Sequence, residues 1–233
     1  MACHDDESNH VRLGDVVVSK AIDRKNQFLY FYVTGNDVEQ QSSSITLETR
    51  PWASGDSELR SVVGKLHRSP KKLWKQLDGF LTEATRDLET IGDTSFIRPP
   101  ADTDQLYRTT GKTETPILHP EVVAGSARDQ RPDLPLIHFG AVASGKILTR
   151  DEGIREEFCR QQKVRAVDSG FQKVLNSLEN QDGLSFVVIR GVSDYSDGTV
   201  HKVWQPYAAL VAAAVMKCIV MRLPLPDDEE GLV

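Results

Sequence analysis

The chain has 233 residues, of which 39% are hydrophobic and 27% charged, and a formal net charge of -6. This length and composition are typical of a single globular domain that buries its own core. The net negative charge argues against a surface that neutralises phosphate backbones, so nucleic acid is not an expected partner.

Cysteine use and apolar runs indicate the compartment. Cys3, Cys159 and Cys218 are odd in number and far apart, with no Cys-x-x-Cys spacing. We therefore expect a reducing, intracellular and cytoplasmic location, with neither a disulfide framework nor a bound metal. The polar, acidic N-terminus is not typical of a secretory signal. The apolar run from Tyr207 to Val220 is short and alanine-rich, so no membrane association is expected.

The first elements are predicted strands. We expect residues 1–10 and 227–233 to be polar tails on either side of one domain over 11–226. Three consecutive valines within Leu13–Ser19 predict a buried strand. The aromatic-rich segment Gln27–Thr34 predicts a second strand.

Two helices and a long connection are predicted next. Apolar residues recur at helical spacing over Asp56–His67 and Pro70–Thr90, and the second segment begins with proline, which suits a first helical turn. From Gly92 to Pro135, prolines, threonines and aspartates replace any apolar periodicity. This range is expected to be a long surface loop or insertion.

The last third of the chain alternates between strand and helix patterns. Strands are predicted over 136–143, 164–167 and 184–190, and helices over 151–162, 171–178 and 206–223. This alternation predicts an α/β fold whose mostly parallel or mixed central sheet is flanked by helices.

Ligands of open α/β sheets bind beyond the carboxyl ends of the strands, so the loops after the predicted strands are the expected location of a site. Each such loop is polar and contains glycine. They begin Ser144-Gly145-Lys146, Asp168-Ser169-Gly170 and Gly191-Val192-Ser193-Asp194.

The loop containing Asp194 is the most informative of the three. A carboxylate directly after a buried apolar strand is costly unless it has partners or a function. Asp197-Gly198 is also a common turn signal, and Ser193 or Asp194 can serve only to order such a turn. The residue pattern leaves both interpretations open.

Three segments together resemble the C-terminal half of the nucleoside phosphorylase and nucleosidase superfamily. They are IHFGAVASGKILTRDEGIREEF, FVVIRGVSDYSDG and VWQPYAALVAAAVMKCIV, and RLGDVVVS is similar to a strand motif from the middle of the same fold. The resemblance implies action on the N-glycosidic bond of a purine-type nucleoside, with phosphate or water as the attacking group. It implies no cofactor beyond phosphate as a co-substrate, and it leaves a homo-oligomer open because family members commonly assemble.

The resemblance also implies roles for individual residues. Asp194 would protonate, or hydrogen-bond to, the purine N7, and Ser193 would orient it. An apolar pocket would raise the pKa of Asp194 for this role. Ser144, Gly145, Ile147 and Leu148 match the stretch that lines the base pocket, with Leu148 where many members have an aromatic residue. A single aliphatic side chain is more often a core residue, and that reading applies to Ile147 and Leu148.

The chain departs from the family pattern in two places. Family members hold the ribose hydroxyls with a glutamate at the position of Gly170; Asp168 would replace it from two positions away, or would only cap the next helix. The family fold begins with strands that contribute phosphate or water-activating contacts, and only a polar segment precedes RLGDVVVS, so we expect an N-terminally truncated version of the fold. The alternative function is a catalytically inactive nucleoside-binding or signalling module that retains the fold.

Overall fold

A computed structural model describes residues 10–21, 28–35, 47–55, 57–110, 113–168, 170–178, 185–195 and 202–224. The predicted tail at 227–233 and all but the last residue of the predicted tail at 1–10 lie outside these ranges.

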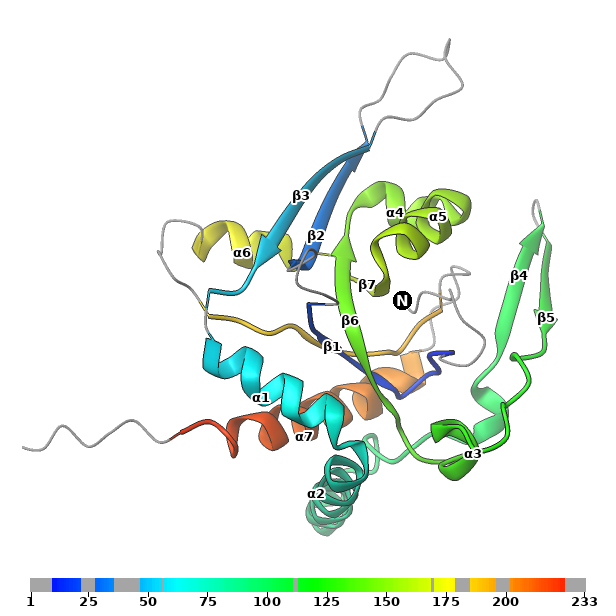
Figure 1. The fold of residues 1–233 in the computed structure, drawn as a ribbon. Helices are drawn as coiled ribbons and strands as arrows, with labels where there is room; N and C mark the ends of the chain where they lie inside the picture. The colour runs from blue at the N-terminus through cyan, green and yellow to red at the C-terminus, as the bar shows by residue number, and fades with distance from the viewer. Residues whose placement is uncertain are drawn as a thin grey trace, which may run out of the picture.

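A six-stranded mixed sheet forms the centre of the fold (Figure 1). The central strand β6 is parallel to β1, β2 and β7, whereas β3 is antiparallel to β2 and β8 is antiparallel to β1. The α/β fold with a mixed sheet flanked by helices is therefore confirmed. The strands are β1 (Val16–Ser19), β2 (Phe28–Gly35), β3 (Leu47–Ala53), β6 (Ile137–Ser144), β7 (Val164–Asp168) and β8 (Ile189–Gly191).

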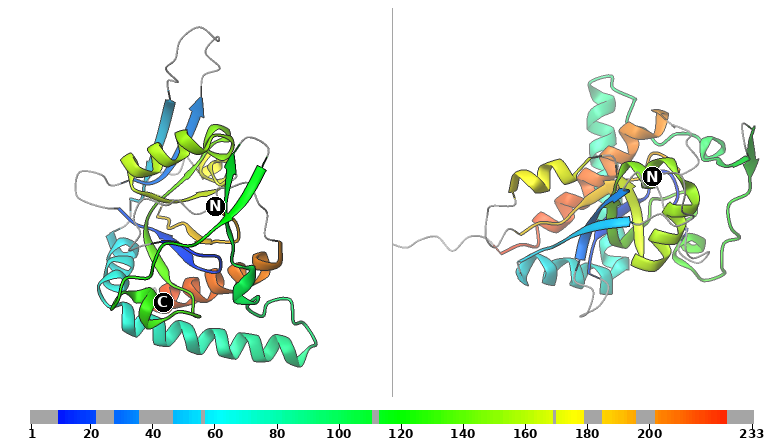
Figure 2. Two further views of the ribbon diagram at one scale, coloured as in Figure 1. Left: turned by 90° about the vertical axis from the view of Figure 1, so that its right-hand side faces the viewer. Right: turned by 90° about the horizontal axis from the view of Figure 1, so that it is seen from above.

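Two groups of helices cover the sheet (Figures 1 and 2). The first group packs over β1 and β8, and its apolar side chains form the larger hydrophobic core with Val16 and Val18. The second group packs beside β2 and β7 over a smaller core that includes Phe31 and Phe158. The first group is α1 (Ser57–Arg68), α2 (Pro70–Thr90) and α7 (Gln205–Val220), and the second is α4 (Lys146–Arg150) and α5 (Glu152–Gln162); α6 (Gln172–Leu178) follows β7.

Helix α7 is a core helix. By length and composition alone, the segment Lys202–Val220, which includes the short 3-10 helix η3 (Lys202–Trp204), could cross a membrane. However, Val211, Val215 and Ile219 are buried in the larger hydrophobic core. The apolar composition of this segment is therefore explained by packing within the fold.

Several elements differ from the predictions. The range 92–135, expected to be a long surface loop or insertion, contains an antiparallel hairpin that stands apart from the central sheet (Figure 2). Strand β3 was not predicted, because most of its side chains are exposed and it contains Pro51, as an edge strand can. The elements within 92–135 are η2 (Ala101–Thr103), β4 (Leu106–Thr110), β5 (Thr113–Ile117) and α3 (Ala127–Gln130).

Candidate functional site

A cavity of about 140 Å³ lies where β7 and β8 end. It is lined by Asp168 at the end of β7, by Ser193 and Asp194 after β8, by Arg190 on β8, and by Thr149 of α4. The structure thus brings together the polar residues predicted from two of the three loops. Because β8 is antiparallel to β1, this arrangement is not the common carboxyl edge of a parallel sheet that the strand pattern indicated.

Asp194 is held by its neighbours in the chain. The Ser193 hydroxyl donates a hydrogen bond of 2.7 Å to Asp194 Oδ2, and both residues are half-buried. The next residue, Tyr195, is fully buried; its hydroxyl accepts a hydrogen bond from the Leu13 amide and donates one to Asp104. Tyr195 therefore anchors the loop in the core. The sequence signal for this anchor was a single aromatic residue in a polar loop.

Asp168 is 4% exposed, and its Oδ1 atom accepts three hydrogen bonds. The donors are the Tyr30 hydroxyl at 2.9 Å, the Gly170 amide at 2.9 Å and the Phe171 amide at 3.1 Å. Two of these donors are amides just before α6, so this atom orders the chain at the start of that helix. Tyr30 was not among the predicted site residues, because it lies 138 positions away in the chain.

The other carboxyl oxygen of Asp168 differs from Oδ1 in its surroundings. Oδ2 is buried and has no hydrogen-bond partner within the part of the chain that the structure describes. A buried carboxylate oxygen left unsatisfied costs about 1–3 kcal/mol, so such atoms usually have a ligand, water or proton as partner. Burial raises the pKa of Tyr30, and the negative charge of Asp168 raises it further, so the phenol stays a donor toward Oδ1.

The four residues predicted to line a base pocket lie elsewhere. The Ser144 hydroxyl donates to Gln172 Oε1 at 3.0 Å, and Leu148 is fully buried in the smaller hydrophobic core, against which Ile147 packs. Gly145 has φ +151°, and a Cβ atom there would lie 2.2 Å from the Val33 carbonyl oxygen. Gly145, Ile147 and Leu148 lie where α4 packs against β2, and Ser144 links β6 to α6. None of the four lines the cavity.

No group of three or more histidine, cysteine, aspartate or glutamate side chains within the described ranges is arranged to hold a metal ion.

Comparison with known proteins shows similarity to part of a longer protein. No family model matches the chain. A nucleotide-binding leucine-rich repeat (NLR)-like protein of Hyaloscypha variabilis is 24% identical over 211 residues, which cover 91% of this chain and 20% of the relative. The chain therefore spans about a fifth of the length of that protein.

Two solved structures each resemble this chain over part of their own length. A uridine phosphorylase of the oomycete Phytophthora capsici has a TM-score of 0.49 and 15% identity, over 96% of this chain and 63% of that one. A 5'-methylthioadenosine/S-adenosylhomocysteine nucleosidase of Neisseria meningitidis has a TM-score of 0.37 and 16% identity, over 92% of this chain and 64% of that one. The chain thus spans less than two thirds of either protein.

Proposed function

We propose that the chain is a nucleoside phosphorylase-like or nucleosidase-like domain that acts on the bond between a purine-type base and ribose. The proposal comes from the sequence resemblance. The observation that carries it further is the cavity lined by Asp168, Ser193 and Asp194, in which one oxygen of Asp168 has no donor among the described residues. A site for a nucleoside needs a proton donor for the base and acceptors for the ribose hydroxyls, and these residues supply both.

Asp194 is the proposed general acid. Breaking an N-glycosidic bond leaves negative charge on the departing base, and a protonated carboxyl at N7 transfers its proton there as the bond to C1' breaks. The hydrogen bond from Ser193 fixes the orientation of the carboxyl group. Phosphate or water then forms the new bond to C1', so the proposal is compatible with both phosphorolysis and hydrolysis.

Asp168 is the proposed acceptor for a ribose hydroxyl. Its Oδ2 atom has no donor among the described residues, whereas Oδ1 is held by Tyr30 and two amides. A ribose hydroxyl that reached Oδ2 would supply that donor while Oδ1 kept its three hydrogen bonds. This contact would replace the one made by the family glutamate, whose position Gly170 occupies.

A second candidate function is a nucleoside-binding or signalling module without catalysis. Gly170 favours it, because glycine has no side chain with which to hold ribose. The relative in Hyaloscypha variabilis also favours it, because this chain matches one fifth of a much longer NLR-like protein. In such a module, Asp168 and Asp194 would bind the nucleoside but would not turn it over.

Release of free base from purine and pyrimidine nucleosides, with and without phosphate, tests the proposal. Release that depends on phosphate supports a phosphorylase, and release without phosphate supports a nucleosidase. Asp194→Asn should lower kcat at least 100-fold, since general acid catalysis contributes about 10²–10⁴-fold. Asp87→Asn, at an exposed position on α2, is the matched control. Undiminished turnover by Asp194→Asn would count against the assigned role, and saturable binding without release would favour the module.

A further inference from the structure

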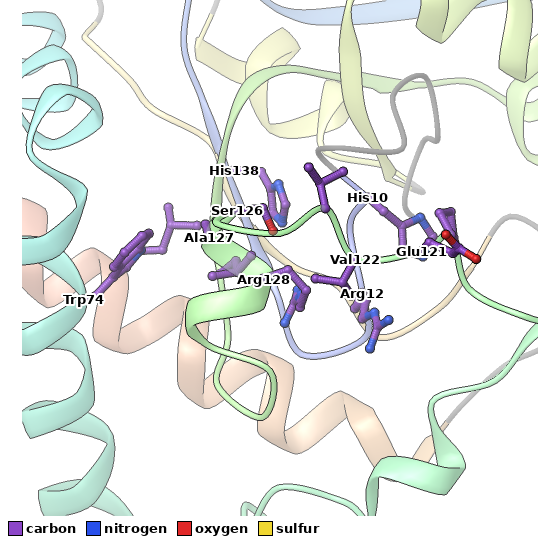
Figure 3. Close-up of a pocket in the computed structure, with 13 residues that line it drawn as sticks. His10, Arg12, Trp74, Glu121, Val122, Ser126, Ala127, Arg128 and His138 are labelled. Carbon is purple, nitrogen blue, oxygen red and sulfur yellow. The ribbon is translucent and has the colours of Figure 1, made fainter.

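A second cavity, of about 90 Å³, lies at the amino ends of β1 and β6 (Figure 3). It shares no lining residue with the candidate site. His138 lines it, whereas Ser144, six residues further along β6, pairs with Asp168 of the candidate site. Six residues of strand span about 20 Å, so His138 and Asp168 are far apart along the sheet.

Beside this cavity lies a buried carboxylate, Asp15, which accepts hydrogen bonds from several residues that line it. Asp15 is 1% exposed, and its Oδ1 atom accepts a hydrogen bond of 2.8 Å from the Leu136 amide. Oδ2 accepts from the Arg12 amide at 2.9 Å, from His138 Nε2 at 2.9 Å and from the Arg128 guanidinium. The charge of Arg128 is therefore balanced by Asp15, and the His138 ring is fixed in orientation.

Two side chains at the cavity, those of Arg12 and Ser126, keep donors that no described residue uses, and His138 keeps a ring nitrogen without a partner there. The Arg12 guanidinium is half-buried and has no hydrogen-bond or ion-pair partner among the described residues. His138 Nδ1 likewise has no partner in that part of the chain. The Ser126 hydroxyl accepts from the Asp129 amide at 3.2 Å, which leaves its own proton free to donate. Figure 3 shows these side chains around the same space.

The remaining walls are mostly apolar and limit the size of a ligand. Trp74, Val122 and Leu136 contribute apolar surface, and the carboxylate of Glu121 is on an exposed residue. The volume is several times the roughly 10–15 Å³ that one water requires, but it is far below the range of about 300–1,000 Å³ typical of drug-sized ligands. A ligand here is therefore small, or it inserts only one group.

We propose that Arg12, His138 and Ser126 form a binding site for a small oxyanion, either inorganic phosphate or the phosphate group of a small organic molecule. Guanidinium groups bind such oxyanions through charge-assisted hydrogen bonds. The Ser126 hydroxyl adds a neutral donor. His138 Nε2 already donates to Asp15, so Nδ1 donates to an anion only when the ring carries both protons. This site is separate from the proposed catalytic cavity and does not depend on the function assigned there.

Calorimetric titration of the full chain with inorganic phosphate tests the site. We expect saturable binding of one phosphate per chain that weakens at least tenfold in Arg12→Gln and less in Arg12→Lys. Arg86→Gln, at an exposed position on α2, should bind like the unchanged chain. Circular dichroism checks that each variant is folded. Absence of saturable binding, or equal binding by Arg12→Gln, would overturn the proposal.

A second comparison separates this site from the candidate site. Arg190 lines the candidate site, so phosphate binding that is lost in Arg190→Gln but kept in Arg12→Gln would assign the anion there and overturn the proposal. Crystals soaked with selenate locate the anion by anomalous scattering without any variant; we expect it beside Arg12 and His138, and its absence from that position contradicts the site. Tighter binding of ribose 5-phosphate than of phosphate would identify an organic phosphate as the ligand, and the reverse would identify the free ion.

Discussion

The hydroxyl of Tyr30 donates a hydrogen bond of 2.9 Å to Oδ1 of Asp168 and so links the middle of β2 to the end of β7. Tyr30 is itself fixed by edge-on ring contacts with Trp52 at 5.8 Å and Phe171 at 5.6 Å. The position of the buried carboxylate is therefore set by the core of the sheet rather than by its loop alone.

Tyr30→Phe should reduce the free energy of unfolding by about 2 kcal/mol, because it removes a buried hydrogen bond to a charged group. Urea denaturation measures the change. Tyr32→Phe is a matched control on the same strand, since Tyr32 has no side-chain hydrogen bond among the described residues, and it should change the stability by less than about 0.5 kcal/mol. Equal losses from both substitutions would show that the Tyr30 hydroxyl is not specifically required.

Gly170→Glu should increase nucleoside affinity at least fivefold if the proposed function is right. A Cβ atom at Gly170 would meet nothing within 4 Å, so a larger side chain fits without displacing its neighbours. The new carboxylate would add an acceptor for ribose hydroxyls at the position where the sequence resemblance places a glutamate. Calorimetric titration with a purine nucleoside measures the affinity. Gly170→Gln has the same size without the charge and should gain less, and a loss of affinity in both would contradict the assigned ribose contact.

Much of the fold could be predicted from local sequence patterns. The run of valines in β1 and the helical spacing of apolar residues in α2 each result from burial of one continuous segment, so a local sequence pattern predicts each element. The antiparallel direction of β8 relative to β1 could not be predicted, because strand direction depends on pairing between distant segments. An apolar run such as the one around Ile189 is compatible with either direction.

The candidate site was predictable in part for the same reason. Asp168 and Asp194 stood out because each is a carboxylate directly after an apolar strand. The role of Tyr30 depends on a contact between β2 and β7 that no local pattern contains. Leu148 matched a pocket-lining position by resemblance, yet it is fully buried in the smaller core, as aliphatic side chains usually are.

Gly191→Ala should destabilise the fold by about 3 kcal/mol, within the upper range for overpacking a core. A Cβ atom there would lie 2.1 Å from the carbonyl oxygen of Ala208, because β8 and α7 approach closely at this point. Gly64→Ala is the control, because it should stabilise the fold. Its Cβ atom would meet only the end of the Arg68 side chain at 3.7 Å, and alanine is favoured over glycine in a helix by about 1 kcal/mol. Thermal unfolding of both variants measures the difference, and a stabilising Gly191→Ala would contradict the observed packing.

Asp15→Asn should reduce the free energy of unfolding at pH 7 by about 3 kcal/mol, because it leaves Arg128 without its buried partner. Burial by itself would raise the pKa of Asp15, but the charges of Arg128 and His138 and the hydrogen bonds from His138 and the Leu136 amide lower it to about 2. A carboxyl whose pKa is lower in the folded than in the unfolded chain stabilises the fold above about pH 4 and loses that contribution as the pH falls toward 2. The gap between this pKa and that of an ordinary aspartate corresponds to about 2 kcal/mol of folding free energy.

Urea denaturation between pH 7 and pH 2.5 should show this loss of stability in the unchanged chain. Asp102→Asn, which alters an exposed aspartate of η2, should show the same loss, whereas Asp15→Asn should not. The same acid dependence in all three proteins would mean that Asp15 is not the group whose protonation weakens the fold.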